Sequence, residues 1–489
     1  MRGGFVTPTW TEIGSNYTWA QLADAFTWSE LAAGPVPDQD IRQISIDRKS
    51  ADVFNRLSVG RASGILENIL AQYSPISGAS GIDVNQILTV KAIEDSTGSI
   101  FGLFSGTIDT ARVIPGEGNK VIQFSASDRA KLFKRTIQTS LQVDTITNTL
   151  FGVILDAAGV VAADRIIDPK MKDDIPFAWL DNISAGEALD RIMRSGAHLM
   201  YIDGKGKFNA KARSSDQFVS PLSSHENFFD LDFAIAEEGI INDAIISSFP
   251  REVSTSVNTI ASIVDTPLIN SGVALTFFLE YLDPDSREPI PVQSLITPVA
   301  SQDYRLFSDE AETGTDLTSA AGVAVTPFAT TALITVTNCG DTPANLTHFQ
   351  LRGNAIQRRS AFLVQLEVAS SQAQYGVSSF KLGTELINKI TFIKNYAEFI
   401  VAQKKDPPQE ISFALKNENP TMLQLDILEK VTLVESNTGI SGDWVVKSVR
   451  DQLSFIRGTE HIRTFEVEQA QAAFFVLDVD KLDIGKLGF

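Results

Sequence analysis

Apolar and polar residues alternate along much of the chain, and this pattern predicts short, half-buried strands. Clear examples are residues 41–46, 121–124, 362–368 and 431–433. The composition changes between residues 254 and 360: this segment is rich in threonine, serine, valine and proline and has almost no helical periodicity. Runs such as 274–278 and 332–337 within it are typical of a β-sandwich of about 100 residues.

Helical periodicity is confined to four segments, 127–137, 145–158, 184–197 and 385–404. In the third, Ser184 can cap the helix and Glu187 completes a capping box. Residues 198–210 then read as two strands around a tight 203–206 turn, which predicts a helix followed by a hairpin. The fold class predicted is mainly β with a few helices.

The N-terminal segment contains a repeat with a spacing of nine residues, in which each unit begins Thr-Trp and matches the Thr-x-x-Glu/Gln capping box. Each unit predicts about two helical turns, and helices this short are marginal alone, so they must dock on something. The body of the same chain and a partner subunit are both open as that surface. The candidate partner-contact residues are Trp10, Trp19, Trp28, Ile13, Leu22 and Leu31.

Composition divides the chain into six parts. They are an arm (1–36), a first β unit (37–140), a helix/strand unit (141–253), the inserted sandwich (254–360), a second β unit with the longest helix (361–475) and a tail (476–489).

Charge and chemistry narrow the function classes. The 489 residues include 41 Lys plus Arg against 60 Asp plus Glu, a net charge of −19, which offers no global field for nucleic acid. Cys339 is the only cysteine, which excludes a disulfide framework, and the four histidines are far apart in sequence. We expect no membrane span and no signal peptide, because no apolar run is long enough for either.

Catalytic motifs are weak. The 204–207 and 314–316 segments lack the spacing of a phosphate loop, and the Asp173-Asp174 pair in a turn is typical of solvated carboxylates. His198, at a helix end before a strand, is predicted to be a core residue or a partner of the helix dipole. We therefore predict no enzymatic activity, no cofactor and no metal.

Several short stretches, ordered along the chain, carry a family resemblance. They are residues 44–48, 58–68, 104–109, 124–132, 187–192, 201–207, 351–355, 375–377 and 439–444. Together they resemble the tail-tip hub or minor tail protein family of long-tailed (siphovirus-type) bacteriophages, related to the baseplate hub proteins of contractile phages.

The resemblance implies a structural protein at the tail tip of a virion, with two tail-tube-like β-barrel domains at 37–140 and 361–475 around the helix-hairpin domain. Three copies would place six barrels in a ring, which adapts a six-fold tube to a three-fold tip. The implied partners are two further copies, tail tube or distal tail proteins, the tape-measure protein, and tail fibre or receptor-binding proteins, with DNA only in transit to the host.

The inserted sandwich and the tryptophan repeat depart from a minimal hub, and the sandwich at 254–360 is a candidate for contact with host surface glycans. The alternatives are a distal tail ring or side-fibre protein, a carbohydrate-binding protein and, last, a cell-wall hydrolase. We expect any central channel to be lined by acidic and neutral side chains, since Lys and Arg would hold passing DNA. The competing account is that acidity only keeps the assembly soluble.

Overall fold

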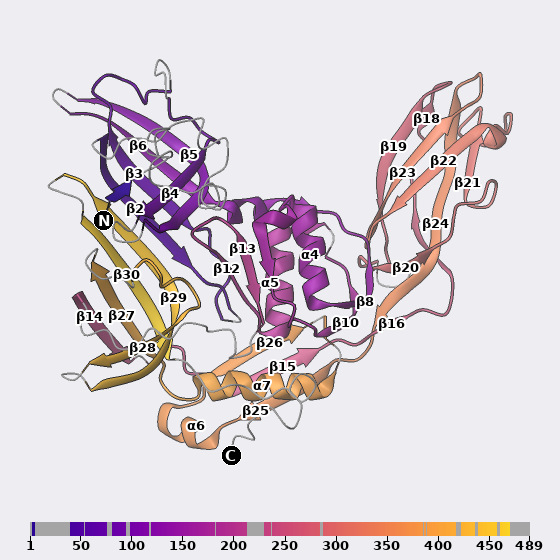
Figure 1. Cartoon of the computed structure of the whole chain (residues 1–489). Helices are drawn as coiled ribbons and strands as arrows, with labels where there is room; N and C mark the ends of the chain where they lie inside the picture. Colours follow the sequence, from indigo (N-terminus) through magenta and orange to yellow (C-terminus); the bar gives the residue numbers. More distant parts are fainter. Residues whose placement is uncertain are drawn as a thin grey trace.

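The protein is mainly β, as predicted, with a few helices in its middle and at its lower edge (Figure 1). The computed structural model describes residues 2–4, 40–52, 54–75, 81–93, 98–116, 119–180, 182–212, 229–235, 237–283, 287–384, 386–387, 389–416, 422–435, 439–456 and 460–469. The tryptophan repeat and the 476–489 tail lie outside these residues.

Within the described residues, the largest element is an 11-stranded sheet in the order β1-β4-β5-β6-β3-β2-β29-β30-β27-β14, with β28 paired to β29 off this path. Its N-terminal strands are β1 (Arg2–Gly4), β2 (Ile41–Lys49), β3 (Arg61–Glu67), β4 (Ile87–Ile93), β5 (Ile100–Gly116) and β6 (Asn119–Asp128). The others are β14 (Phe229–Ile235), β27 (Gln409–Lys416), β28 (Lys430–Glu435), β29 (Ile440–Ser454) and β30 (Glu460–Gln469).

The seam of this sheet is the antiparallel pairing of β2 with β29, which brings Gln43 opposite Ser454 and Lys49 opposite Ser448. The pairing joins the strands from the two ends of the chain into one sheet (Figure 1). One hydrophobic core serves both sides of the seam, because Ile44 and Ile46 of β2 pack in the same cluster as Phe465 of β30.

The helix/strand unit follows β6. Its elements are η2 (Arg129–Lys134), β7 (Thr136–Ile137), β8 (Gln142–Ile146), α4 (Thr147–Ala158), η3 (Ala162–Asp164), β9 (Arg165–Ile167), β10 (Asp174–Ala178), β11 (Ile183–Ser184), α5 (Ala185–Gly196), β12 (Leu199–Ile202) and β13 (Phe208–Lys211). The Ser184 hydroxyl accepts a hydrogen bond from the Glu187 amide at 3.1 Å, so α5 begins where the sequence predicts. The predicted hairpin is also present, since β12 pairs antiparallel with β13.

The helix predicted over 127–137 is wrong. Ser127 and Asp128 extend β6 instead, since Ser127 pairs with Arg61 of β3. Only the short 3-10 helix η2 follows, with the Asp128 carboxylate accepting a hydrogen bond from the Ala130 amide. Strand pairing therefore overrides the local helical period at this position.

A small three-stranded sheet with β15 (Asp243–Ser248) at its centre lies below the helix/strand unit (Figure 1). Its neighbours are β25 (Phe362–Glu367), which is antiparallel, and β26 (Ser379–Thr384), which is parallel. The helix α7 (Ile390–Lys404) packs Ile393, Ala397 and Ile400 into the same apolar cluster as Ala244 and Ile246 of β15. A shorter helix, α6 (Ala369–Tyr375), connects β25 to β26. The helix predicted over 385–404 begins at Ile390, because Leu386 and Ile387 are buried in the core of the helix/strand unit.

The 254–360 region forms an arm that projects from the body (Figure 1). Its strands are β16 (Arg251–Val253), β17 (Asn258–Ser262), β18 (Leu268–Ile269), β19 (Ala274–Glu280), β20 (Val292–Leu295), β21 (Tyr304–Phe307), β22 (Ala321–Pro327), β23 (Thr331–Asn338) and β24 (Ala344–Arg358), with a 3-10 turn η5 (Thr318–Ala320). Residues from both of its sheets, among them Ile334, Val336 and Phe349, fill a separate core.

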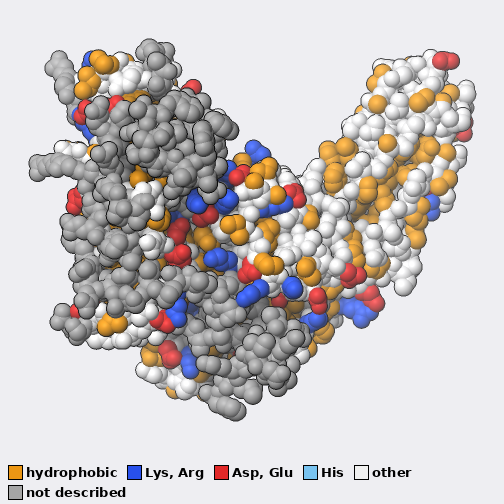
Figure 2. Space-filling model, in the orientation of Figure 1, with side chains coloured by type: hydrophobic (Ala, Val, Ile, Leu, Met, Phe, Trp, Pro, Cys, Tyr) orange, Lys and Arg blue, Asp and Glu red, His pale blue; other side chains and the backbone are white. Residues whose placement is uncertain are grey.

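At the base of the arm, β16 pairs with the last residues of β24, with Arg251 opposite Arg358. Figure 2 shows mostly apolar and uncharged side chains along the visible face of the arm, whereas charged side chains gather on the body and near the arm's base. Among the described residues, no helix is both long enough and apolar enough to span a membrane.

Candidate functional site

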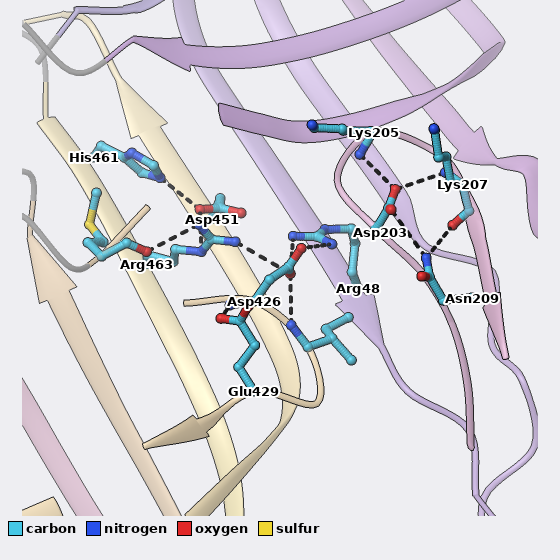
Figure 3. A network of polar contacts seen from close by, with 12 residues as sticks. Arg48, Asp203, Lys205, Lys207, Asn209, Asp426, Glu429, Asp451, His461 and Arg463 are labelled. Carbon is cyan, nitrogen blue, oxygen red and sulfur yellow. Dashed lines mark hydrogen bonds and ion pairs between the residues drawn. The ribbon is translucent and has the colours of Figure 1, made fainter. Parts of the chain in front are cut away.

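A buried network of charged side chains crosses the seam of the large sheet (Figure 3). Arg48 stands at a core-facing position near the end of β2 and is 2% exposed. Its guanidinium donates two hydrogen bonds to the Asp426 carboxylate, one from Nη2 to Oδ1 at 2.9 Å and one from Nη1 to Oδ2 at 3.4 Å. This bidentate pair ties β2 to the loop that precedes β28, 378 residues further along the chain.

The network continues on the C-terminal strands. The Arg463 Nε lies 3.4 Å from Asp451 Oδ1, and its Nη1 donates to the Met422 carbonyl at 3.2 Å. The His461 Nε2 lies 2.8 Å from the same Asp451 oxygen. The two arginines therefore face two carboxylates; Arg48, Arg463 and Asp451 are buried, and the Asp426 side chain is 28% exposed.

Burial and neighbouring charge oppose each other at these carboxylates. Burial alone would raise the pKa of Asp451, but the Arg463 guanidinium and the hydrogen bond with His461 hold the pKa below its ordinary value. Burial raises the pKa of Glu429, which accepts a hydrogen bond from the Asp426 amide, to about 7. Within the part of the chain that the structure describes, no group of three or more His, Cys, Asp or Glu could hold a metal ion. The arrangement is suited to fastening strands together.

The hairpin turn between β12 and β13 fastens the helix/strand unit to the large sheet. Asp203 organises it by accepting hydrogen bonds from the amides of Lys205 and Lys207, at 3.0 and 2.8 Å. A Cβ on Gly204 would lie 2.0 Å from the Gly102 carbonyl oxygen of β5, so only glycine allows this approach. The Gly-Lys-Gly-Lys segment thus serves a backbone contact, in keeping with its lack of phosphate-loop spacing.

A second charged group connects the body to the α7 layer. Lys447 on β29 lies 3.1 Å from an Asp52 oxygen and 3.2 Å from a Glu468 oxygen, and Lys404 at the end of α7 also pairs with Glu468. Burial raises the pKa of the Glu468 carboxyl, but the two lysines outweigh it and lower the pKa to about 2. Glu468 is therefore ionised at every ordinary pH.

A hollow of about 400 Å³ opens on the side of the sheet away from the core. We call it the basic hollow; it is lined by Val59, Arg61, Asp109, Ser127, Lys131, Leu132, Lys134 and Arg135. Asp109, the one acid among them, lies 3.2 Å from Lys131 Nζ and accepts a hydrogen bond from the Ser127 hydroxyl. Among the described residues, Arg61, Lys134 and Arg135 have no ion-pair partner. The hollow is a local concentration of positive charge on a chain of net charge −19.

The six residues predicted to contact a partner all lie in the tryptophan repeat, outside the described residues. The two aspartates weighed as a carboxylate pair are engaged elsewhere: an Asp173 oxygen lies 3.0 Å from His198 Nε2, and Asp174 pairs with Lys389. His198 is 1% exposed and follows the end of α5, as expected of a core residue. On the sandwich, Phe278 of β19 is 54% exposed and stacks on Phe328 with ring centroids 6.4 Å apart.

Sequence reasoning missed the seam network, although the strands carried a signal for it. Arg48 continues the period-two row of Ile44 and Ile46, a position where the pattern demands an apolar residue. His461 and Arg463 likewise precede Phe465 and Val467 on one face of β30. Charged residues at core positions of strands indicate buried pairs, but their partners cannot be read from spacing.

No protein-family model matches the chain, and no curated protein matches it. Among solved structures it is similar to a 43 kDa tail protein of prophage MuSo2 from Shewanella oneidensis, with 10% identity, 87% of this chain and 94% of that chain covered, and a TM-score of 0.48. It is also similar to a tail protein from Neisseria meningitidis, with 7% identity, coverage of 88% and 92%, and a TM-score of 0.47.

A third similar structure is a component of the E. coli type VI secretion system that itself resembles the T4 bacteriophage tail proteins gp27 and gp5. It shares 5% identity, with 88% of this chain and 74% of that chain covered and a TM-score of 0.39. These structural neighbours are phage tail proteins and a tail-related secretion component.

Proposed function

We propose that the chain is a structural hub of a bacteriophage tail tip, in which three copies form a ring that closes or extends the tail tube. The observation that carries this proposal is the β2–β29 seam, because it fuses two antiparallel β units of one chain side by side in a single sheet. Three such chains supply six units, which matches a six-fold tube to a three-fold tip.

The ends of the large sheet support association between copies. Among the described strands, β14 pairs with β27 alone, and Phe233 and Ile235 on it are 37% and 60% exposed although they share a face with the buried Ile411. At the opposite end, β1 pairs with β4 at Lys91–Ile93 among the described residues, and Ile87, further along β4, is 72% exposed. An exposed apolar edge strand is a template for pairing with another chain, so these ends are the natural contacts of a ring.

In this role the chain performs no chemistry. The buried charges of the seam network are engaged in pairs that fasten strands. The partners of the chain are tail tube or distal tail proteins, the tape-measure protein and fibre or receptor-binding proteins, with DNA only passing through. The tryptophan repeat, with Trp10, Trp19 and Trp28, serves as an assembly arm on one of these partners.

A side-fibre or carbohydrate-binding role is the second candidate, and the exposed Phe278 beside Phe328 favours it. Aromatic faces that are partly open to solvent suit sugar rings, and the hydroxyls of Thr276 and Thr335 lie next to each other on the same sheet. On the hub proposal, this face is the place where the arm touches host glycans.

The test is the copy number, measured by native mass spectrometry of the full chain and by reconstruction of the virion tail tip. We expect a trimer, and Ile235→Asp should weaken it while the monomer stays folded. The matched control is Val264→Asp on the arm, because Val264 is 95% exposed. A monomer or a hexamer at the tail tip would contradict the proposal.

A further inference from the structure

We infer that the basic hollow is the docking surface for the acidic β14 end of a neighbouring copy of this chain. The inference rests on the proposed ring and adds the surfaces through which the copies recognise each other.

The acidic end of the sheet is the counterpart of the hollow. It consists of five exposed carboxylates on β14, on the turn after it and at the start of β27, namely Asp230, Asp232, Glu237, Glu238 and Glu410. None of them has an ion-pair partner among the described residues. Five uncompensated acids on an edge strand repel one another, and a cationic surface would relieve that repulsion.

The two surfaces lie on the same side of the same sheet. Residues directly opposite each other on paired strands point to one side. Asp232 stands opposite Ser412, Ser412 opposite Glu466, and Glu466 opposite Ser448.

The same row continues across the seam. Ser448 stands opposite Lys49 on β2. Asp47, two residues before Lys49 on the same side of β2, stands opposite Arg61 of β3. Arg61 in turn stands opposite Ser127 of β6, in the wall of the hollow. The neighbouring Ile46 and Ala62 are buried in the core, so this row faces away from it. The hollow, on β3, β5 and β6 of the N-terminal half, and the acidic end, at β14 on the C-terminal edge, therefore share one face of the sheet.

A head-to-tail contact joins two different surfaces of identical molecules. It would seat the acids of one copy against the unpaired Arg61, Lys134 and Arg135 of the next, next to the β14 edge whose apolar residues also need cover. A phosphate-bearing polymer is the competing occupant, but the charge of −19 repels it over the rest of the surface. A second copy brings the acids already positioned on the right face.

The experiment is charge reversal and exchange in the full chain, read as the association constant of the trimer in low salt. Reversing two cations of the hollow, Lys134→Glu with Arg135→Glu, should lower that constant by about tenfold or more, because like charges then face each other. Reversing the acids alone, Asp232→Lys with Glu410→Lys, should do the same. Combining all four substitutions should restore the constant to within about threefold.

The matched control is Lys381→Glu, an exposed lysine on β26, which should leave the association constant unchanged. If the wild-type chain forms no trimer, the proposed function fails. If it forms one and the reversals change nothing, or the exchange restores nothing, the ring stands and the docking inference is overturned. It is also overturned if the wild-type trimer binds short duplex DNA and the Lys134→Glu, Arg135→Glu trimer stays intact but loses that binding.

Discussion

The pair of Arg48 and Asp426 shows how neighbouring charges compensate for the burial of a charged side chain. Arg48 is 2% exposed, and burial alone would lower the pKa of its guanidinium, but Asp426 and Asp451 raise it above its ordinary value. The charges of Asp426 and Asp451 therefore offset the cost of burying this guanidinium.

Removing both partners should cost less than the sum of removing each one alone. Arg48→Met leaves Asp426 with less compensation and should lower the free energy of unfolding by about 3–5 kcal/mol. The double variant with Asp426→Leu removes one charge of each sign and leaves Arg463 paired with Asp451. We expect it to cost less than the sum of the single variants by about 1–3 kcal/mol, measured by urea denaturation of all four proteins. Additive costs would show that the pair contributes no coupling.

Glu468 makes stability depend on pH. Its pKa is lowered from 4.5 to about 2, so the folded state binds this proton less readily than the unfolded state does. The stability it contributes is present above pH 4.5 and is lost as the pH falls through 4.5 towards 2. Glu468→Gln should lower the free energy of unfolding by about 2–4 kcal/mol at pH 7 and by much less at pH 3.

The control for this prediction is Glu466→Gln on the same strand. The Glu466 side chain is 48% exposed and pairs with Lys49, so its replacement should cost less than about 1 kcal/mol at pH 7. The measurement is the free energy of unfolding of both variants at pH 7 and pH 3. If Glu468→Gln lowers it equally at both pH values, the lowered pKa of Glu468 does not contribute to stability.

At the scale of elements, alanine substitution of Gly204 tests whether close packing of the β12–β13 turn on β5 stabilises the fold. Gly204→Ala would push a Cβ into the Gly102 backbone, which cannot move without distorting β5, so we expect a loss of about 1–3 kcal/mol. Gly152→Ala is the matched control, since the space around Gly152 in α4 is open and alanine favours a helix by about 0.5–1 kcal/mol. Thermal melts should therefore shift in opposite directions.

The elements that sequence could predict are those defined by neighbours in the chain. Ser184 and Glu187, three residues apart, predict where α5 begins, and the 203–206 turn predicts the position of the hairpin. The β2–β29 seam could not be predicted, because two strands about 400 residues apart leave no mark in each other's local pattern. The basic hollow could not be predicted either, because Arg61 lies near Lys134 and Arg135 only once β3 has paired with β6.

At the scale of the molecule, the arm should be separable from the body. It has its own core, and β16 and the end of β24 form its two-stranded base. Replacing 256–358 with a short Gly-Ser linker should leave a soluble body that still assembles and melts like the parent protein, and the 254–360 fragment should fold alone. The deletion removes contacts between the base of the arm and the body, such as the hydrogen bond from the Ala329 amide to the Thr139 carbonyl, and we expect the body to fold without them. An insoluble body after the deletion would place the boundary elsewhere.

The last prediction concerns the channel of the proposed ring. Across the middle of the large sheet, the face away from the core carries an uncharged row in which Ser45 stands opposite Ser63, Ser63 opposite Ser125, and Ser45 opposite Gln452. If this row lines the channel, DNA meets hydroxyls and amides that do not hold its phosphates, while the cations of the basic hollow on the same face are covered by the neighbouring copy; each exposed lysine or arginine contact would add affinity by counterion release.

Placing lysines there, with Ser45→Lys and Ser63→Lys, should make the assembled ring retain duplex DNA, and each added phosphate contact should steepen the salt dependence of binding by about 0.9 in log–log slope. The matched control is Thr276→Lys with Thr335→Lys on the arm, which adds the same charge at two opposed strand positions away from the channel. Binding of duplex DNA to the rings at several salt concentrations is the measurement. Equal retention by both variants would mean that the acidity of the chain serves solubility and that this face does not line the channel.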